Sequence, residues 1–591
     1  MNRIIMESIN FEFLREKWPE LASLGGFAEQ YAWPDPESAL VKLRSYAEAI
    51  VNRFYDDNGF LKPYQATFNE LLQADSFKRA VPSVVLNTFH GIRIAGNKAA
   101  HGEPITRFNV PNLLQDAFSL GCWFFVISGG SRDDCPRFTL PRRPAYLAET
   151  TEAVLQQKRQ IQEKLAANEI EMQTLLAELE ETRSKSQAAE KKVEELVALL
   201  KTGEAAADVL GFDEAMTRKR LIDTRLAAAG WDVGSGGQNT SQVTQEEPVS
   251  HQPTATGKGY ADYVLWDDNG LPLAVIEAKK TAVSAELGQE QVRLYADGLE
   301  KMHGRRPVIF YTNGFDVFIW DDEQGYPPRR IYGFYSKDSL QYLIYQRKNK
   351  LSLDKLAPRL EIVDRLYQIE AIKRITEKYA VNQRKALIVQ ATGTGKTRVA
   401  IALTDLLYRA KWIMRILFLC DRKELRKQAK NAFNDFLDEP MTIVSSGTAK
   451  DRDKRIYLAT YPAMNKIYET FDAGFFSLII ADESHRSIYN RYRDMFRYFD
   501  CLQVGLTATP VQYISRNTFK VFECEDKTPT AYYPLDQAVE EGFLVPYEVY
   551  SHTTQFLREG IKYKDLSEEQ RRQLEEDGED PESFNVPFRD G

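Results

Sequence analysis

One stretch organises the chain: residues 386–397, ALIVQATGTGKT. The apolar residues 387–389 predict a buried strand. The glycines that follow let backbone N–H groups close on phosphate oxygens, at the positive end of a helix that begins near Lys396. The Lys396 ammonium would neutralise the β- and γ-phosphates of ATP, and the Thr397 hydroxyl would ligate Mg²⁺. The residues expected to cradle the nucleotide are Thr392, Gly393, Thr394, Gly395, Lys396 and Thr397.

A second nucleotide-binding motif follows the phosphate cradle, at residues 476–485. The pattern QATGTGKT resembles motif I of superfamily 2 helicases and translocases, although Gln390 stands where the strict pattern has its first glycine. Residues 476–481 predict a second buried parallel strand, which ends in residues 482–485, DESH, similar to a DEAD/DExH-like Walker B box. The resemblance implies that Asp482 holds Mg²⁺ through water and that Glu483 positions and deprotonates the attacking water.

Further segments extend the same resemblance. Residues 504–510, VGLTATP, resemble motif III, which couples nucleotide state to strand movement in that superfamily. Tyr367 and Gln368 resemble the adenine-reading element, where the Gln368 amide can both donate to and accept from the base edge. Residues 417–422 and 458–461 correspond to strand ends that contact nucleic-acid phosphates in that fold.

The composition is that of a folded protein of several domains. At 591 residues the chain is too long for one core, and 43% hydrophobic with 27% charged residues is ordinary for a globular protein. The formal net charge of −8 does not exclude DNA, because a nucleic-acid groove needs basic residues only along one surface. Scattered cysteines without a C-x-x-C pair argue against disulfides and zinc. No signal-peptide core or long apolar run occurs, so we expect a cytoplasmic protein without a membrane partner.

Residues 1–145 predict a helical N-terminal domain, because apolar residues recur with the spacing of one buried helix face. Arg93 and His101 bound the segment RIAGNKAAH, which resembles the small helical domains at the front of many restriction subunits and, distantly, the RNA-cleaving HEPN family. One histidine without a second acid or base nearby is a poor catalytic signal. We therefore interpret Arg93 and His101 as structural or partner-facing.

Residues 146–205 predict a long helix or coiled-coil connector, since residues 151–201 are rich in Glu, Lys, Gln, Ala and Leu and contain neither proline nor glycine. Apolar residues fall on the a and d positions of a heptad, but polar residues interrupt the seam. An intramolecular helix or hairpin and a dimerising coiled coil therefore both remain open. Gly203 is expected to end the helix.

Residues 206–345 predict an α/β domain with chemistry of its own. A helix opens near Glu214, and a polar loop follows over residues 234–257. Residues 259–266 and 273–279 then alternate like two paired strands around the turn DDNG. A hairpin of this kind brings residues of its two strands into direct contact.

Two carboxylates and an ammonium converge in the predicted hairpin. Asp262 lies nearly opposite Glu277, while Glu277 and Lys279 are two residues apart and share one face. Asp262 and Glu277 would bind the Mg²⁺ that stabilises charge on a scissile phosphate. Lys279 would orient or activate the attacking water.

The hairpin pattern resembles the P-D…(D/E)-x-K motif of Mg²⁺-dependent nucleases, with Ala261 in the place of the proline. Gln291 and Tyr295, four residues apart on the next predicted helix, resemble the Q-x-x-x-Y element of type I restriction enzymes. Glu214 could approach the metal from the opening helix. A surface salt bridge explains most isolated E-x-K patterns, so the combination with the hairpin carries the nuclease prediction.

The order of the regions resembles the R subunit of type I restriction-modification enzymes, the HsdR family. The predicted fold is multidomain α/β: a helical N-terminal domain, a long helix, a PD-(D/E)xK nuclease domain and a RecA-like parallel-sheet helicase domain. A basic linker over residues 346–360 would lead to the ATPase over residues 361–541, and residues 542–591 would cross toward a second RecA-like domain. Too little sequence remains for that domain, so we expect a fragment of a longer subunit or a truncated gene product that binds nucleotide without translocating.

The resemblance implies a type I site-specific deoxyribonuclease. It would hydrolyse ATP to translocate double-stranded DNA and would cleave unmethylated foreign DNA with Mg²⁺, while methylation (M) and specificity (S) subunits supply sequence recognition. Two alternatives stay open. One is a stand-alone superfamily 2 helicase or remodeller in which the Asp262, Glu277 and Lys279 cluster is a structural ion-pair network. The other is a nucleotide-gated interaction subunit, against which DNA-stimulated ATP turnover would count.

Overall fold

The structure is a computed structural model. It describes residues 8–62, 66–100, 108–142, 193–234, 238–278, 286–314, 316–445, 451–482, 492–508, 522–524 and 528–546. Predictions that lie outside the described residues concern Lys279, Glu483, His101, the Glu214 side chain, residues 151–192 and residues 547–591. The chain forms two compact units, Met1–Tyr533 and Pro534–Gly591. The described part of the second unit contains the short helix α18 (Leu535–Glu540), and the elements below belong to the first.

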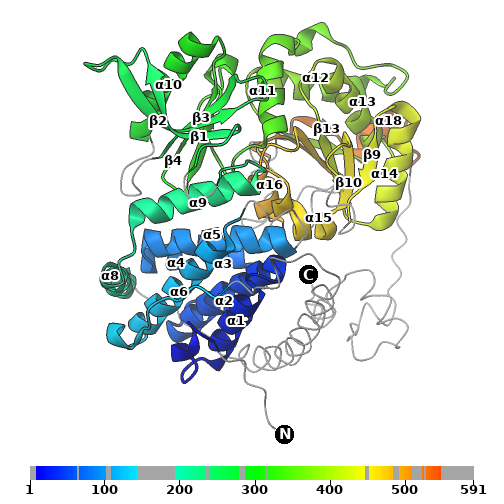
Figure 1. The fold of residues 1–591 in the computed structure, drawn as a ribbon. Coiled ribbons are helices and arrows are strands. Elements are labelled where there is room, and N and C mark those ends of the chain that lie inside the picture. Colours follow the sequence, from blue (N-terminus) through cyan, green and yellow to red (C-terminus); the bar gives the residue numbers. More distant parts are fainter. Residues whose placement is uncertain are drawn as a thin grey trace, which may run out of the picture. The chain divides into compact units, whose positions relative to one another are not determined.

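The amino-terminal part of the first unit is built from helices around an aromatic-rich core (Figure 1). Its helices are η1 (Glu12–Leu14), α1 (Pro19–Tyr31), α2 (Pro36–Asp57), α3 (Phe68–Gln73), α4 (Asp75–Ala80), α5 (Ser83–Ala100) and α6 (Val110–Ile127). Asp35 caps α2 by accepting a hydrogen bond from the Ser38 backbone N–H at 3.3 Å. Thr67 and Glu70 form a capping box at the start of α3. These local signals fix where the helices begin.

α6 is the one helix among the described residues that is long and apolar enough to cross a membrane by length and composition. Within the structure 56% of that helix is buried. It packs against α2, α5 and α8 (Val193–Val209). Trp123 and Phe124 are each 1% exposed, so the apolar character of α6 corresponds to core packing.

The prediction that Gly203 ends the long helix is wrong. α8 continues through Gly203 to Val209. A Cβ atom at Gly203 would lie 2.9 Å from Pro82 Cδ, and the Trp123 indole N–H donates to the Gly203 carbonyl at 3.1 Å. The missing side chain therefore allows α8 to approach its neighbours closely, which is a use of glycine that the sequence alone does not separate from helix termination.

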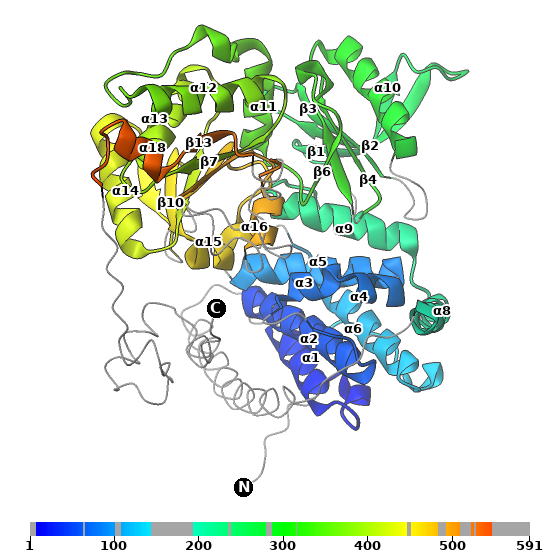
Figure 2. The ribbon, with the colours of Figure 1, turned by 180° about the vertical axis from the view of Figure 1, so that it is seen from behind.

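The middle of the first unit contains a six-stranded sheet in the order β1-β2-β3-β4-β5-β6. Its strands are β1 (Val243–Ser250), β2 (Lys258–Trp266), β3 (Pro272–Ala278), β4 (Val308–Thr312), β5 (Val317–Trp320) and β6 (Arg329–Ile331). β2 and β3 form the antiparallel hairpin that the sequence predicted, whereas β3 and β4 are parallel. α10 (Glu286–His303) covers one face, with Val292 packed on Val275. α9 (Glu214–Ala228) covers the other and also contacts α5 (Figure 2).

The predicted loop over residues 234–257 contains a strand, which is a correction. β1 pairs with β2 along Val243–Ser250. Glu246 has φ 49° and Pro248 lies within the strand, so the alternating pattern is interrupted. Proline is tolerated because β1 is an edge strand with one neighbour and needs no donor on its outer side.

The carboxyl-terminal part of the first unit contains a seven-stranded parallel sheet in the order β13-β7-β12-β11-β8-β10-β9. Its strands are β7 (Lys385–Gln390), β8 (Ile416–Cys420), β9 (Met441–Ile443), β10 (Ile456–Thr460), β11 (Leu478–Ala481), β12 (Leu502–Thr507) and β13 (Ala531–Tyr533). One face carries α12 (Leu366–Ala380), α13 (Lys396–Arg409) and α14 (Lys423–Phe436); the other carries α15 (Tyr461–Ile467) and α16 (Arg493–Tyr498). Because the strands are parallel, their carboxyl ends share one edge.

The predicted linker over residues 346–360 begins inside α11 (Lys337–Asn349) and is packed. The side chain of Arg347 is 7% exposed and lies 2.8 Å from the Asp321 carboxylate. Gln346 donates to the Trp412 carbonyl at 2.7 Å, and the Trp412 indole N–H donates to Leu351 O at 2.7 Å. These contacts attach the start of the predicted linker to Asp321 and to the segment around Trp412.

Candidate nucleotide and nuclease sites

The predicted phosphate cradle connects the end of β7 to the start of α13. Gly393 and Gly395 have φ values of 88° and 86°, the left-handed region that glycine enters without strain. α13 begins at Lys396 with Gly395 as its N-cap, so its first backbone N–H groups face the turn. The Lys396 ammonium donates to the Gln390 carbonyl at 3.3 Å. The predicted strand, turn and helix are therefore confirmed, and the turn has the form that accepts a nucleotide phosphate.

The Thr394 carbonyl holds this turn in place. It accepts hydrogen bonds from the Tyr367 hydroxyl and from Gln368 Nε2, each at 2.9 Å. The Tyr367 ring also stacks on Tyr533 at a centroid distance of 3.8 Å. A Cβ atom at Gly395 would lie 2.6 Å from Gln368 Nε2, so the second glycine is needed for this close approach. The predicted adenine-reading residues are thus attached to the phosphate turn, and their contact with a base stays a prediction.

Asp482 lies at the same edge of the parallel sheet. It follows β11, which is separated from β7 by β12 alone. The Asp482 backbone N–H donates to Leu419 O at 2.8 Å, and the Tyr461 hydroxyl donates to the Asp482 carbonyl at 2.9 Å. These two contacts fix the backbone from which the carboxylate projects. The role predicted for Asp482 as a Mg²⁺ ligand is consistent with this edge position, while Glu483 falls outside the described residues.

β12, which carries the first part of the predicted motif III, lies between the strands of the two nucleotide boxes. It pairs in parallel with β7 and with β11. A Cβ atom at Gly505 would lie 2.5 Å from the Phe522 ring, so Phe522 packs directly on the backbone of β12. A displacement of β12 would therefore have to be shared with both neighbouring strands.

Asp262 and Glu277 come together on the antiparallel hairpin. The register pairs Tyr263 with Ile276, which places Asp262 opposite Glu277. Asp262 Oδ2 accepts a hydrogen bond from the Ala278 backbone N–H at 2.6 Å. Glu277 is 4% exposed. The register agrees with the predicted placement of the two residues across the hairpin. Oxygen ligands of this kind suit Mg²⁺, and metal binding by this pair stays a prediction.

The predicted Q-x-x-x-Y residues lie on α10, on the same side of the sheet. Glu277 alternates with Ile276 and so points to the face of Val275, against which α10 packs. On α10, Gln291 Nε2 donates to the Tyr295 hydroxyl at 2.8 Å. The described residues contain no group of three acidic, histidine or cysteine side chains able to hold a metal. Asp262 and Glu277 are therefore the described part of the predicted site, and Lys279 lies outside the described residues. α9, which begins at Glu214, packs on the opposite face of the sheet, so the predicted approach of Glu214 to the metal gains no support from this arrangement.

Two contacts show what the sequence reasoning missed. The six-stranded sheet β1–β6 is called the nuclease-like sheet below. On its opposite face, the Tyr263 hydroxyl donates to Asp223 Oδ1 at 2.9 Å. Burial raises the pKa of Asp223 to about 6. Arg93, interpreted as structural or partner-facing, forms a buried ion pair with Glu469. A charged residue within an apolar helix face was the available signal, but its partner lies far away in sequence.

Two models of protein families match parts of this chain. A family model described as "Type III restriction enzyme, res subunit" matches residues 361–512, and a model described as "Type I restriction enzyme R protein N terminus" matches residues 138–327. The first covers the phosphate cradle and Asp482, and the second covers Asp262 and Glu277. Two regions of the chain are therefore similar to restriction-enzyme subunits, and residues 361–512 contain the helicase-like boxes.

The chain is also similar to individual endonuclease subunits of type I restriction enzymes. The EcoAI endonuclease subunit of Escherichia coli, a type I restriction enzyme, is 33% identical over an alignment of 380 positions that covers 58% of this chain and 44% of the relative. The type I EcoKI endonuclease subunit of Escherichia coli K12 is 26% identical over 711 residues, covering 98% of this chain and 59% of the relative. A solved fragment assigned to an HsdR subunit of Vibrio vulnificus YJ016 is 26% identical, covers 57% of this chain and 62% of that chain, and has a TM-score of 0.27.

The matches to the family models and the curated relatives include both predicted sites and the region before them. The chain is similar to the HsdR family, the endonuclease subunits of type I restriction enzymes. It spans 44% and 59% of the lengths of the two Escherichia coli relatives.

Proposed function

We propose that the chain supplies the motor and nuclease parts of a type I restriction-modification enzyme. In a subunit of the length of the Escherichia coli relatives, these parts would use ATP to translocate double-stranded DNA and Mg²⁺ to cleave unmethylated foreign DNA, together with methylation and specificity subunits. The observation that carries the proposal is the presence, in one compact unit, of a phosphate cradle on a parallel sheet and of paired carboxylates on a separate mixed sheet.

The motor part rests on the shape of the cradle. ATP with Mg²⁺, when bound, supplies the phosphoryl group whose transfer releases the energy for movement. The backbone N–H groups at the start of α13 would hold the phosphate oxygens, and the Lys396 ammonium would neutralise their charge. Thr397 and Asp482 would hold the metal together. Thr397 lies in α13 after β7, Asp482 follows β11, and β12 lies between β7 and β11 in the sheet. Because β12 pairs with both, a change at the phosphates has a direct structural route to the motif III segment.

The nuclease part rests on the hairpin geometry. Asp262 and Glu277 would hold Mg²⁺, which stabilises charge on the scissile phosphate when bound. The Ala278 N–H orients the Asp262 carboxylate through its 2.6 Å hydrogen bond. Lys279 would orient the water, and Gln291 with Tyr295 would position the DNA or the metal ligands from α10. Since α10 covers this face of the sheet, DNA would approach along the edge where the hairpin strand β3 ends.

The test is reconstitution with the methylation and specificity subunits of the same system. DNA that carries the recognition site is offered unmethylated or methylated, with ATP and Mg²⁺ omitted in turn. We expect cleavage of the unmethylated DNA only, with both ATP and Mg²⁺ required. ATP hydrolysis without any cleavage would favour the stand-alone helicase, and nucleotide binding without DNA-stimulated hydrolysis would favour the nucleotide-gated subunit.

A further inference from the structure

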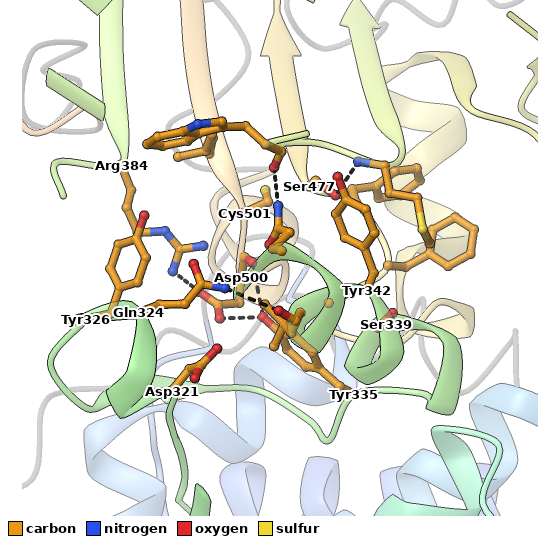
Figure 3. A pocket seen from close by; sticks show the side chains of 18 of the residues that line it. Asp321, Gln324, Tyr326, Tyr335, Ser339, Tyr342, Arg384, Ser477, Asp500 and Cys501 are labelled. Atoms are coloured by element: carbon orange, nitrogen blue, oxygen red, sulfur yellow. Dashed lines mark hydrogen bonds and ion pairs between the residues drawn. The ribbon is translucent and has the colours of Figure 1, made fainter. Parts of the chain in front are cut away.

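A cavity of about 80 Å³ lies between the nuclease-like sheet and the parallel sheet (Figure 3). One wall comes from the segment around Tyr326 and from α11. The other comes from residues just before the parallel strands, including Arg384 before β7, Ser477 before β11 and Asp500 before β12. The nucleotide residues follow the carboxyl ends of these strands, so the cavity lies at the opposite edge of the sheet. It belongs neither to the ATP site nor to the Asp262 and Glu277 pair.

The ion pairs at this cavity leave an excess of positive charge. Asp500 is bound by two guanidinium groups, Arg329 at 2.8 Å and Arg384. The other acidic residue of the lining, Asp321, pairs with Arg347 at 2.8 Å, and Arg347 also pairs with Glu323 outside the cavity. The lining therefore carries three cationic side chains, Arg329, Arg384 and Lys350, against the two carboxylates.

Lys350 adds a further cation that has no acidic partner among the described residues. Its ammonium lies 3.5 Å from the centroid of the Trp412 ring and 5.4 Å from that of Tyr326. Nη1 of Arg329 is buried and has no hydrogen-bond partner in the described part of the chain. Burial, together with repulsion from Arg384, lowers the pKa of Lys350 to about 8. One N–H group of the buried Arg329 guanidinium therefore lacks the acceptor that such burial normally requires, and the Lys350 ammonium has no carboxylate partner among the described residues.

We propose that the cavity binds a phosphate-type oxyanion between the Lys350 ammonium and the Arg329 guanidinium. A doubly charged oxyanion matches two cationic donors and offers several acceptor oxygens to the unused N–H groups. A metal cation would be repelled by the excess positive charge, and an apolar ligand would leave the donors unpaired. Because Arg384 belongs to the parallel sheet and Arg329 to the nuclease-like sheet, the bound anion would contact the junction between the two.

The test is isothermal titration of the 591-residue chain with inorganic phosphate at pH 7 and constant ionic strength. Lys396→Ala is introduced first, so that the nucleotide cradle does not contribute. We expect saturable binding at one site, weakened at least about tenfold by Lys350→Met, which removes the charge and keeps an unbranched apolar chain over Trp412. Lys348→Met is the matched control, because Lys348 is exposed and does not line the cavity. Absence of saturable binding, or equal binding by Lys350→Met, would overturn the proposal.

A second measurement uses pH. The charged and titratable groups that face Lys350 are Arg384, Asp321 and Tyr326. With a pKa of about 8, Lys350 is mostly protonated at pH 7 and about one-tenth protonated at pH 9. Phosphate affinity should therefore fall several-fold between these pH values in the parent chain, and the Lys350→Met variant should not show this fall. An unchanged affinity in the parent would contradict the assignment of Lys350.

The natural source of the oxyanion is distinguished by competition. A short DNA with a 5′-phosphate and the same DNA with a 5′-hydroxyl are added to the phosphate-loaded chain. Displacement by the phosphorylated DNA alone identifies a DNA end as a ligand, whereas displacement by neither supports free phosphate, such as the product of ATP hydrolysis. Equal displacement by both DNAs would show that the site does not recognise phosphate monoesters and would overturn the proposal.

Discussion

The two sheets of the first unit place their chemistry in different ways. In the parallel sheet, the nucleotide residues follow the carboxyl ends of strands and form short continuous segments such as residues 390–397. In the mixed sheet, the acidic residues lie within neighbouring strands, and only the hairpin register brings Asp262 opposite Glu277. A loop motif is therefore recognisable from the sequence alone, whereas a strand-borne site depends on a pairing that must also be predicted correctly.

The largest expected effect separates the nuclease from the motor. Asp262→Asn should reduce DNA cleavage by the assembled enzyme by about a thousandfold or more, because it would remove a charged ligand of the proposed Mg²⁺, worth several kcal/mol. DNA-stimulated ATP hydrolysis should remain within about twofold of the parent, since that site lies on the other sheet. Cleavage is measured on circular DNA and hydrolysis by phosphate release.

The control for this change is Asp268→Asn in the turn of the same hairpin. Asp268 is exposed and forms a surface ion pair with Lys337, so its loss should alter neither activity. A cleavage rate in Asp262→Asn equal to that of Asp268→Asn would show that the hairpin is not the nuclease site.

A second substitution tests the nucleotide cradle of the parallel sheet and should leave the Asp262 and Glu277 pair unaffected. Lys396→Ala should slow ATP hydrolysis by about 100- to 1,000-fold, because a positive charge is lost where negative charge develops on the phosphates. Mg²⁺ binding at Asp262 and Glu277 should be unaffected. Phosphate-release assays compare it with Lys373→Ala, an exposed lysine of α12 in a loose 3.9 Å ion pair. Near-parental hydrolysis in Lys396→Ala would contradict the motor assignment.

A smaller effect tests whether the two sheets are coupled through Asp500. Burial alone would raise the pKa of Asp500, but Arg329 and Arg384 outweigh it and hold this pKa well below the usual 3.8. Asp500→Asn should destabilise the folded chain by about 3–5 kcal/mol, because it leaves buried guanidinium groups without their anion. Urea denaturation is the measurement, with Asp453→Asn, whose Lys454 pair is exposed, as the control.

The pH dependence follows from the sign of the same shift. A carboxylate whose pKa is lowered in the folded state contributes stability that is complete above its unfolded pKa and is lost as the pH falls through its folded pKa. The difference in stability between the parent chain and Asp500→Asn should therefore be constant above about pH 5 and shrink below about pH 4. A difference that grew on acidification would exclude Asp500 as an ionised centre of the junction.

The smallest expected effect concerns the hydroxyl that holds the phosphate turn. Tyr367→Phe removes the hydrogen bond that its hydroxyl donates to Thr394 O and the one that it accepts from Arg365 Nη1, while leaving the ring stacked on Tyr533. The loss of the bond to the phosphate turn is worth about 1 kcal/mol, so ATP should bind about fivefold more weakly. Fluorescent-nucleotide titration compares it with Tyr532→Phe, whose side chain is 61% exposed. An unchanged Kd would show that the Tyr367 hydroxyl does not organise the turn.

Several errors and omissions of the sequence reasoning share one cause. Gly203 looked like a helix end but allows helix packing against Pro82, and the polar loop contained an edge strand with Pro248 inside it. The basic residues after residue 345 were predicted only to begin a linker, whereas the Arg347 side chain is buried against Asp321. In each case the residue type was correctly noted, and the neighbour that gives it a different role lies elsewhere in the chain.

The sequence by itself determined the phosphate cradle around Lys396, the strand before it, the helix after it and the hairpin carrying Asp262 and Glu277. These features depend on backbone conformations and pairings that adjacent residues control, such as the left-handed glycines and the DDNG turn. Only the tertiary structure decided the contacts of Asp500, Lys350 and Arg93. Their partners are distant in sequence, and whether a buried charge is paired depends on which surfaces meet when the two sheets and the helical region pack together.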